Sequence, residues 1–226
     1  MRPMRLARAC VLPAAVAASV PALAAGGHHA VDDANILEPG NCKAQGWLTN
    51  EDGGERLLHA DIGCRVGPVE LNAAAIYAHE HDKSSQSGSG LQVKWATEVA
   101  PRFSAGLEVA GAWQAHARSS WIGATLATLF TWTPRGDLAV HLNVGRDFVD
   151  HGTDMAHSGV AVEWTASPGW SFVGERFVQL QTQYLRAGAR WAVDKTWTVD
   201  LSRAHSLSGR FGSLWTLGAS WQFDRR

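Results

Sequence analysis

Beyond about the first forty residues, the chain alternates apolar and polar side chains with a period of two. In residues 91–99, for example, Val93 and Trp95 share one face, while Gln92 and Lys94 share the other. This period is typical of β-strands whose two faces meet different surroundings. The same alternation fits residues 183–193 better than helical spacing does.

The alternation and the turn residues between segments predict an all-β protein of about twelve antiparallel strands. The predicted strands span residues 42–50, 55–66, 69–80, 91–99, 103–115, 121–132, 138–148, 159–166, 170–178, 183–193, 197–205 and 213–223.

The connections between these strands fall into two sets. Every other connection is tight, such as residues 67–68 and 167–169, and the alternate set includes longer polar stretches, such as residues 82–90 and 150–159. Short turns at one end and longer loops at the other are typical of an outer-membrane β-barrel. An even number of strands would place both chain ends at the short-turn, periplasmic end.

A β-sandwich also has alternating strands, but it would bury its large aromatic side chains in the middle of the strands. Here the aromatic residues lie near strand ends, as expected for belts at two membrane–water interfaces. The belt near the tight turns contains Phe103, Trp132, Trp164, Trp170, Trp197, Trp221 and Phe223, and the belt near the longer loops contains Tyr77, Trp113, Trp121, Phe148, Tyr184 and Trp215. The pattern therefore favours a transmembrane barrel over a sandwich.

The N-terminus has the features of a secretory signal peptide. It begins with Arg2, Arg5 and Arg8, continues with an apolar stretch to Leu23, and fits a small-residue cleavage site after Ala24. We therefore expect a signal peptide at residues 1–24, a periplasmic or plug segment at 25–41 and the barrel at 42–226. Losing three arginines takes the formal charge from −1 to −4, too weak a balance to indicate a nucleic-acid partner.

Two of the three cysteines bracket residues 42–64, and the third, Cys10, lies in the expected signal peptide. Folding this stretch about Gly53 pairs Cys42 with Cys64, and the same register aligns the apolar and polar stripes of both strands. In an oxidising compartment this predicts a disulfide across the first hairpin. Free or metal-binding thiols are the alternative.

The same register arithmetic brings opposite charges together on the polar, inward face. The predicted cross-strand pairs are Arg65 with Glu70, Lys94 with Glu108, and Arg190 with Asp200. We expect these pairs to contact pore water, and either to stiffen the wall, to select solutes, or both. The predicted lumen-lining residues are Gln45, Asp61, Arg65, Glu70, Lys94, Glu108, His141, Arg190 and Asp200.

The ten histidines invite a search for catalytic or metal chemistry. His79 and His81 would share a face at a loop end, and His151 and His157 lie in the longest loop region. Loop histidines are common, however, so no metal site, cofactor or catalytic residue is assigned. No G-x-S-x-G motif is present, and nothing resembles the His/Ser/Asn-Gly motif of the outer-membrane phospholipase. The sequence therefore does not predict an enzyme.

Residues 25–41 have no strand period. Six residues of this stretch fit the N-terminal motif of a known family: His29, Asp32, Asp33, Ala34, Pro39 and Gly40. On these residues the sequence resembles the outer-membrane proteins of the meta-pathway of phenol degradation. Val31 stands where that family usually has threonine, and residues 43–45 replace its usual Gln-Leu-Glu. The resemblance implies a barrel that transports small compounds, with aromatic compounds among the candidates.

Together these patterns predict a passive outer-membrane channel or transporter for small molecules. Its expected partners are outer-membrane lipid, an unidentified solute and the outer-membrane assembly machinery. The assembly machinery is expected because the last strand ends in Trp221-x-Phe223, which resembles its C-terminal recognition signal. Two alternatives are a structural or loop-binding barrel without transport and, less favoured, an outer-membrane hydrolase. Flux into liposomes separates the first two possibilities.

Overall fold

In the computed structural model, residues 28–79, 84–117 and 119–224 are described. The expected signal peptide, Cys10 and His81 lie outside these residues. No helix in the described part of the chain is long and apolar enough to cross a membrane.

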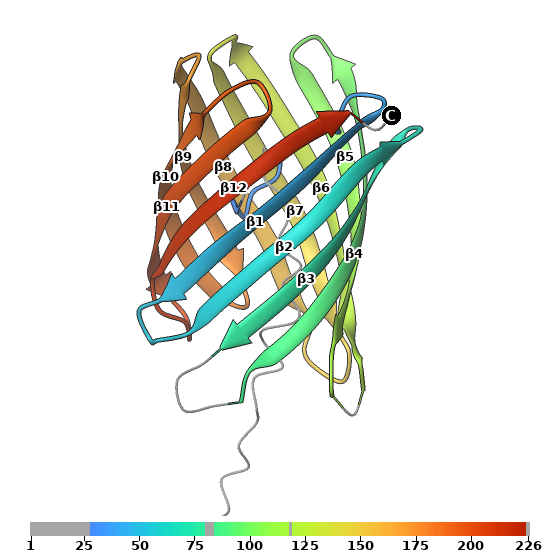
Figure 1. The fold of residues 1–226 in the computed structure, drawn as a ribbon, viewed down its shortest axis with the longest axis vertical. Helices are drawn as coiled ribbons and strands as arrows, with labels where there is room; N and C mark the ends of the chain where they lie inside the picture. Colours follow the sequence, from blue (N-terminus) through green and yellow to red (C-terminus); the bar gives the residue numbers. More distant parts are fainter. Residues whose placement is uncertain (1–27, 80–83, 118, 225–226) are drawn as a thin grey trace, which may run out of the picture.

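Twelve strands form the fold, and each follows the previous one around a barrel (Figure 1). They are β1 (Asn41–Glu51), β2 (Arg56–Val66), β3 (Val69–His79), β4 (Gln86–Ala100), β5 (Phe103–Gln114), β6 (Trp121–Arg135), β7 (Leu138–Val149), β8 (Met155–Ser167), β9 (Trp170–Gln179), β10 (Thr182–Ala192), β11 (Trp197–Ser208) and β12 (Leu214–Asp224).

The barrel closes because β1 pairs with β12 along its full length, from Asn41 opposite Asp224 to Glu51 opposite Leu214. Every neighbouring pair is antiparallel, so the closed sheet has no unpaired edge strand. The predicted fold class and strand number are therefore confirmed.

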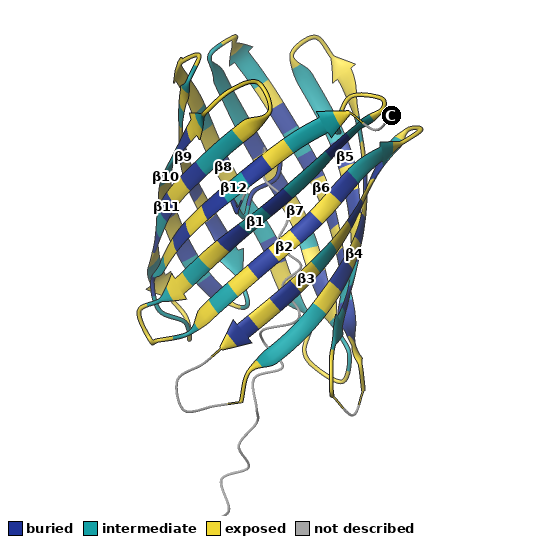
Figure 2. Cartoon of the chain, in the orientation of Figure 1, coloured by how far each residue is buried: buried dark blue, intermediate teal, exposed yellow. Residues whose placement is uncertain are grey.

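Burial alternates along every strand, as the banding of Figure 2 shows. Apolar side chains on the outer face are about half exposed, for example Leu91 at 57% and Leu217 at 55%. Charged side chains on the inner face are buried, and Glu108 and Asp200 are 0% exposed. An apolar outside around a polar inside is the arrangement of a barrel surrounded by lipid.

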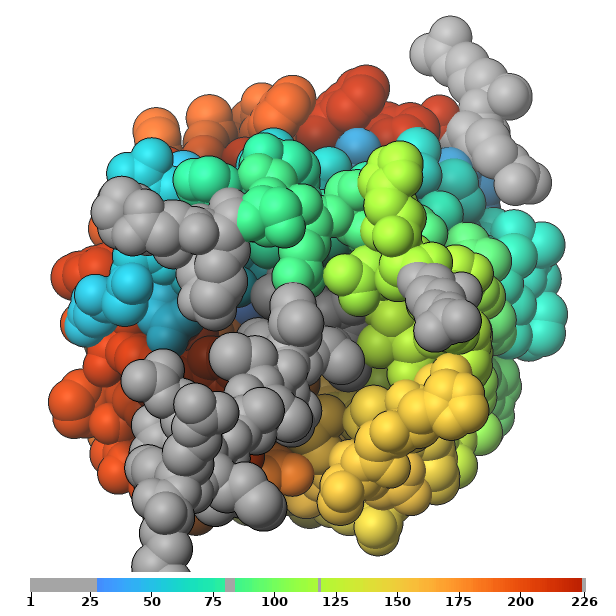
Figure 3. Space-filling model, turned by 90° about the horizontal axis from the view of Figure 1, so that it is seen from below, coloured from blue at the N-terminus to red at the C-terminus, as the bar shows by residue number. Residues whose placement is uncertain are grey.

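The two ends of the barrel differ. We call the end that carries both Asn41 and Asp224 the turn end, and the opposite end the loop end. The arrowhead of β12 lies at the top of Figure 1, which is the turn end. Figure 3 looks at the loop end, where the connections that follow β5 and β7 stand at separate positions on the rim.

Most of the predicted belt aromatics face outward. At the turn end, Trp132, Trp164, Trp170, Trp197 and Trp221 are 40–53% exposed, and at the loop end, Tyr77, Trp121, Phe148 and Trp215 are 39–50% exposed. The prediction for Tyr184 was wrong. Its side chain is 3% exposed and stacks on Phe177 inside the barrel. Tyr184 has the same strand parity as Arg186, so the alternation of β10 itself directs it inward.

The first hairpin has the predicted register. Cys42 lies opposite Cys64 and is joined to it by a disulfide, and Trp47 lies opposite His59. The two rings stack with their centroids 3.7 Å apart on the inner face. The disulfide joins the first two strands close to the turn end.

Candidate functional site: the lumen and the segment inside it

Residues 28–40, which precede β1, lie inside the barrel; we call them the lumen segment. His29, Val31, Asp32 and Ala34 are each 1% exposed, although none belongs to a strand. A buried segment without secondary structure must find other partners for its backbone N–H and C=O groups. Here the partners are side chains of the barrel wall.

One wall carboxylate holds the start of the lumen segment. Glu175 on β9 accepts hydrogen bonds from the backbone N–H of Ala30 at 3.2 Å and of Val31 at 3.0 Å. Arg186 on β10 donates to Glu175 at 2.8 Å and to the backbone carbonyl of His28 at 2.7 Å. Glu175 and Arg186 together thus bind backbone N–H groups and a backbone C=O group of the segment.

Further along, the segment crosses to other strands. The N–H of Ala34 donates to the Thr131 hydroxyl at 2.8 Å. The N–H of Leu37 donates to Glu70 at 3.0 Å, and Arg65 donates to the Leu37 carbonyl at 2.9 Å. Contacts to β2, β3, β6, β9 and β10 therefore fix the segment across the lumen.

The side chains of the segment contact charged groups of the wall as well. The Lys94 ammonium lies 2.7 Å from Asp32 and 3.1 Å from Asp33. The His29 ring lies 3.5 Å from Glu175 and 4.0 Å from Asp200. Because Lys94 and Asp32 are buried, loss of either one would leave the charge of the other without this partner.

Apolar contacts and wall glycines complete the fit. Val31 packs in a cluster with Ala161, Val173, Phe177, Tyr184 and Ala204. A Cβ added at Gly159 would come within 2.6 Å of Val31, and one at Gly188 within 3.1 Å of the His29 ring. The wall is therefore shaped to the segment, with glycine at points of close approach.

All nine predicted lumen residues lie on the inner face or at its turn-end mouth. Eight are 0–9% exposed: Gln45, Asp61, Glu70, Lys94, Glu108, His141, Arg190 and Asp200. Arg65 is half-buried. His141 contacts the Thr131 hydroxyl at 2.9 Å and lies 3.8 Å from Glu163.

The three predicted cross-strand pairs are opposite each other in the observed registers. Only Arg190 and Asp200 form a direct ion pair as expected, at 2.7 Å, with Glu163 3.3 Å from the same guanidinium. Lys94, Arg65 and Glu70 instead contact the lumen segment. Two of the three predicted cross-strand ion pairs are therefore replaced by contacts with the lumen segment.

Sequence reasoning did not single out Glu175 as a lumen residue. It lies opposite Arg186 across the Leu180–Gln181 turn, so the register arithmetic used for the other hairpins would have paired them. The role of Thr131 had no such signal, because its partner is the backbone of a segment with no strand period.

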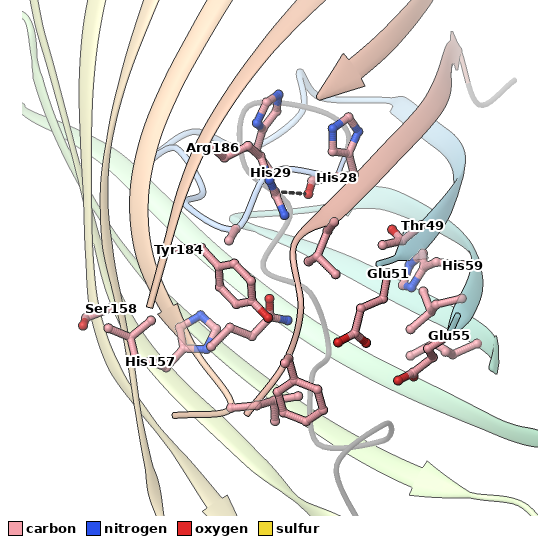
Figure 4. Close-up of a pocket in the computed structure, with 18 residues that line it drawn as sticks. His28, His29, Thr49, Glu51, Glu55, His59, His157, Ser158, Tyr184 and Arg186 are labelled. Carbon is pink, nitrogen blue, oxygen red and sulfur yellow. Dashed lines mark hydrogen bonds between the residues drawn. The ribbon is translucent and has the colours of Figure 1, made fainter. Parts of the chain in front are cut away.

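Two cavities flank the lumen segment. A cavity of about 130 Å³ lies on the loop side, and its lining includes His28, His59, His157, Tyr184 and Arg186. In Figure 4, Tyr184 and His157 come from one wall, and Glu51, Glu55 and His59 from the facing one. The second cavity, of about 340 Å³, lies at the turn end against Asp33, Lys43, Glu70, Lys94 and Lys195.

The histidines considered for metal binding are dispersed. His79 contacts the Ser85 hydroxyl, His151 is exposed beside Asp150, and His157 faces the lumen 3.4 Å from Asp147. Among the described residues, no three His, Cys, Asp or Glu side chains are grouped so that they could hold an ion.

A family model matches residues 13–223, and its family is described as "Uncharacterised conserved protein UCP029691". The chain belongs to this family. A search of curated protein sequences found no match to this chain.

Solved structures share the fold. The KdgM porin superposes with a TM-score of 0.64 at 12% identity, covering 80% of this chain and 99% of the porin. The COG4313 outer membrane channel from Pseudomonas putida F1 gives 0.67 at 9% identity, covering 84% and 98%. The toluene transporter TbuX of Ralstonia pickettii gives 0.53 at 9% identity, covering 83% and 90%. The barrel is thus that of bacterial outer-membrane channels, and these neighbours are porins and transport channels rather than enzymes.

Proposed function

We propose that this protein is a passive outer-membrane channel for small molecules, closed at rest by the lumen segment. One observation carries the proposal: residues 28–40 cross a polar lumen between two cavities, one toward each end of the barrel. A barrel built only as a scaffold has no need of cavities on both sides of a separable segment.

The proposal accounts for the nature of the contacts. The segment is held by hydrogen bonds and ion pairs to the wall, such as Lys94 with Asp32, and water or a polar solute can replace such contacts. The named structural neighbours include a porin and a toluene transporter, which supports transport in general. The resemblance to the meta-pathway proteins supports small compounds, including aromatic ones, as candidate solutes.

A reversible lock tests the proposal. The backbone N–H of Ala34 lies 2.8 Å from the Thr131 hydroxyl, so Ala34→Cys with Thr131→Cys should allow a disulfide between segment and wall. In planar bilayers, the oxidised double variant should remain silent, and reduction should restore openings at the wild-type frequency.

Wild-type protein treated with the same reductant is the matched control, because reduction also opens the Cys42–Cys64 bond.

Deleting residues 28–40 while keeping the preceding segment should raise the conductance above that of the wild type. A deletion variant that inserts into bilayers and carries no current would show that the barrel is a scaffold without transport.

A further inference from the structure

A row of polar side chains on the inner wall takes no part in holding the lumen segment. Asp61 on β2, Asn72 on β3, Gln92 on β4 and Glu108 on β5 come from four consecutive strands. We call these four residues the polar stripe. They are 8%, 5%, 3% and 0% exposed.

The stripe is continuous across the strands. Asn72 lies directly opposite Gln92. Asp61 is opposite Ala74, two residues from Asn72, and Glu108 is opposite Lys94, two residues from Gln92. Diagonal neighbours at this spacing are within reach of long side chains.

Several atoms of the stripe lack a hydrogen-bond partner among the described residues. These are Asp61 Oδ1 and both side-chain polar atoms of Asn72, while the Gln92 amide is a neighbouring donor of the Glu108 carboxylate without a hydrogen bond of ordinary geometry. Buried polar atoms in proteins nearly always have partners, and exceptions call for a reason. On the β9–β11 wall, Glu175 and Arg186 bind the lumen segment, and only the Arg186 Nε and Asp200 Oδ2 atoms of the Glu175, Arg186 and Asp200 side chains lack a hydrogen-bond partner within the described part of the chain.

Carboxylates outnumber lysines and arginines on the inner wall. The strand residues that are buried include six acids, Asp61, Glu70, Glu108, Asp147, Glu175 and Asp200, and three permanently charged bases, Lys94, Arg186 and Arg190, beside the histidines His59, His141 and His157. Each of the three bases already contacts a carboxylate. Two further acids, Asp32 and Asp33, come from the lumen segment. The carboxylates around the lumen therefore outnumber its lysine and arginine side chains.

We propose that the polar stripe is the side of the lumen along which solute passes, and that Asp61 and Glu108 make it selective for small cations. Carboxylate and amide oxygens are the ligands that hard cations prefer. Acidic side chains around a pore favour cations, whereas anion pores use Arg or Lys. The inference rests on the proposed channel function and adds to it the charge class of the solute.

Close neighbours of the stripe fit this role. His59 lies 3.0 Å from Asp61 Oδ2 and leaves Oδ1 without a partner. Farther around the inner wall, His157 on β8 lies 3.4 Å from Asp147 on β7. The nearest lysine, Lys94, is occupied by Asp32 and Asp33.

The test is the reversal potential of the full mature protein in planar bilayers under a KCl gradient. The wild type should prefer K⁺ over Cl⁻. The combined variant Asp61→Asn, Glu108→Gln should lower the K⁺/Cl⁻ permeability ratio severalfold, and Asn72→Asp should raise it. Asp137→Asn removes a charge from an exposed turn and should leave the ratio unchanged, because salt screens distant surface charges. Heat-modifiable gel mobility shows that each variant has folded.

Open channels that prefer Cl⁻, or a ratio that the double variant leaves unchanged, would overturn the inference while the channel function stands. A silent bilayer contradicts the channel function, and a second measurement then decides the inference. Trp47 stacks on His59 beside the stripe, so its emission reports on ions that reach the stripe. The emission of Trp47 alone is obtained by subtracting the spectrum of Trp47→Phe from that of the wild type. Stronger quenching of this signal by Cs⁺ than by iodide supports a cation-accessible stripe, and the reverse order overturns it.

Discussion

The two sides of the lumen carry similar residue types but differ in what they contact. On β9–β11, Glu175, Arg186, Arg190 and Asp200 are joined to one another or to the lumen segment. On β2–β5, the polar stripe has buried oxygen and nitrogen atoms without partners in the described structure. Under the proposed channel function, the barrel wall thus holds polar groups for two purposes, one to bind the lumen segment and one to face the solute. Side-chain composition alone does not separate them, whereas the contacts do.

The largest effect is expected where a buried ion pair is broken on the β9–β10 side. Arg186→Met would leave Glu175 buried without its guanidinium partner, which typically costs about 3–5 kcal/mol. Urea unfolding of the folded barrel should report this loss. Glu108→Gln, on the opposite side, removes a carboxylate without a hydrogen-bond partner and should cost far less. Equal losses for the two variants would mean that the two sides do not differ.

The disulfide next to the stripe is the second test. Replacing Cys42 and Cys64 with alanine releases a loop with a sequence separation of 22, and such loops typically contribute about 3 kcal/mol. The unfolding free energy should fall by about this amount, while the K⁺/Cl⁻ permeability ratio should remain that of the wild type. A changed ratio would show that the first hairpin also positions the stripe.

Two glycines on neighbouring strands test the fit of the lumen segment more finely. Gly159→Ala would press on Val31 and on Phe177, and overpacking of this kind typically costs about 1–3 kcal/mol. Because part of this strain falls on Val31 of the lumen segment, channel openings should become more frequent. Gly174→Ala is the matched control, since a Cβ there meets nothing within 4 Å. Similar behaviour of the two variants would argue that the segment does not close the channel.

The smallest effect is expected outside the lumen, in the β10–β11 turn. The N–H groups of Thr196 and Trp197 and the Thr196 hydroxyl donate to Asp194 and lower the pKa of its carboxyl group. A lowered pKa stabilises the folded state above the ordinary Asp pKa, and this stability is lost as the pH falls through the lowered value. Asp194→Asn should therefore slightly reduce stability at neutral pH and flatten its decline in acid. An identical pH profile for variant and wild type would exclude this contribution.

The sequence was sufficient to predict the barrel, because a period of two and alternating loop lengths are local signals. It was also sufficient for the register at Cys42 and Cys64 and for the Arg190–Asp200 pair, which follow from counting across a short turn. The partners of Lys94 could not be predicted in this way. Asp32 belongs to a segment without periodicity, and no turn fixes its distance from β4. Tyr184 was misplaced because its nearness to a strand end was given more weight than its parity.

The lumen segment also has a consequence for how the molecule is assembled. His28 reaches Ser202 across 174 positions of sequence, and Ala30 reaches Glu175 across 145. Contacts between residues so far apart in sequence form late in folding, because a long stretch of chain must be ordered before these contacts add stability. Residues 28–30, which are synthesised before all twelve strands, are therefore among the last to find their partners. A docked segment therefore requires a barrel whose last strands are already in place.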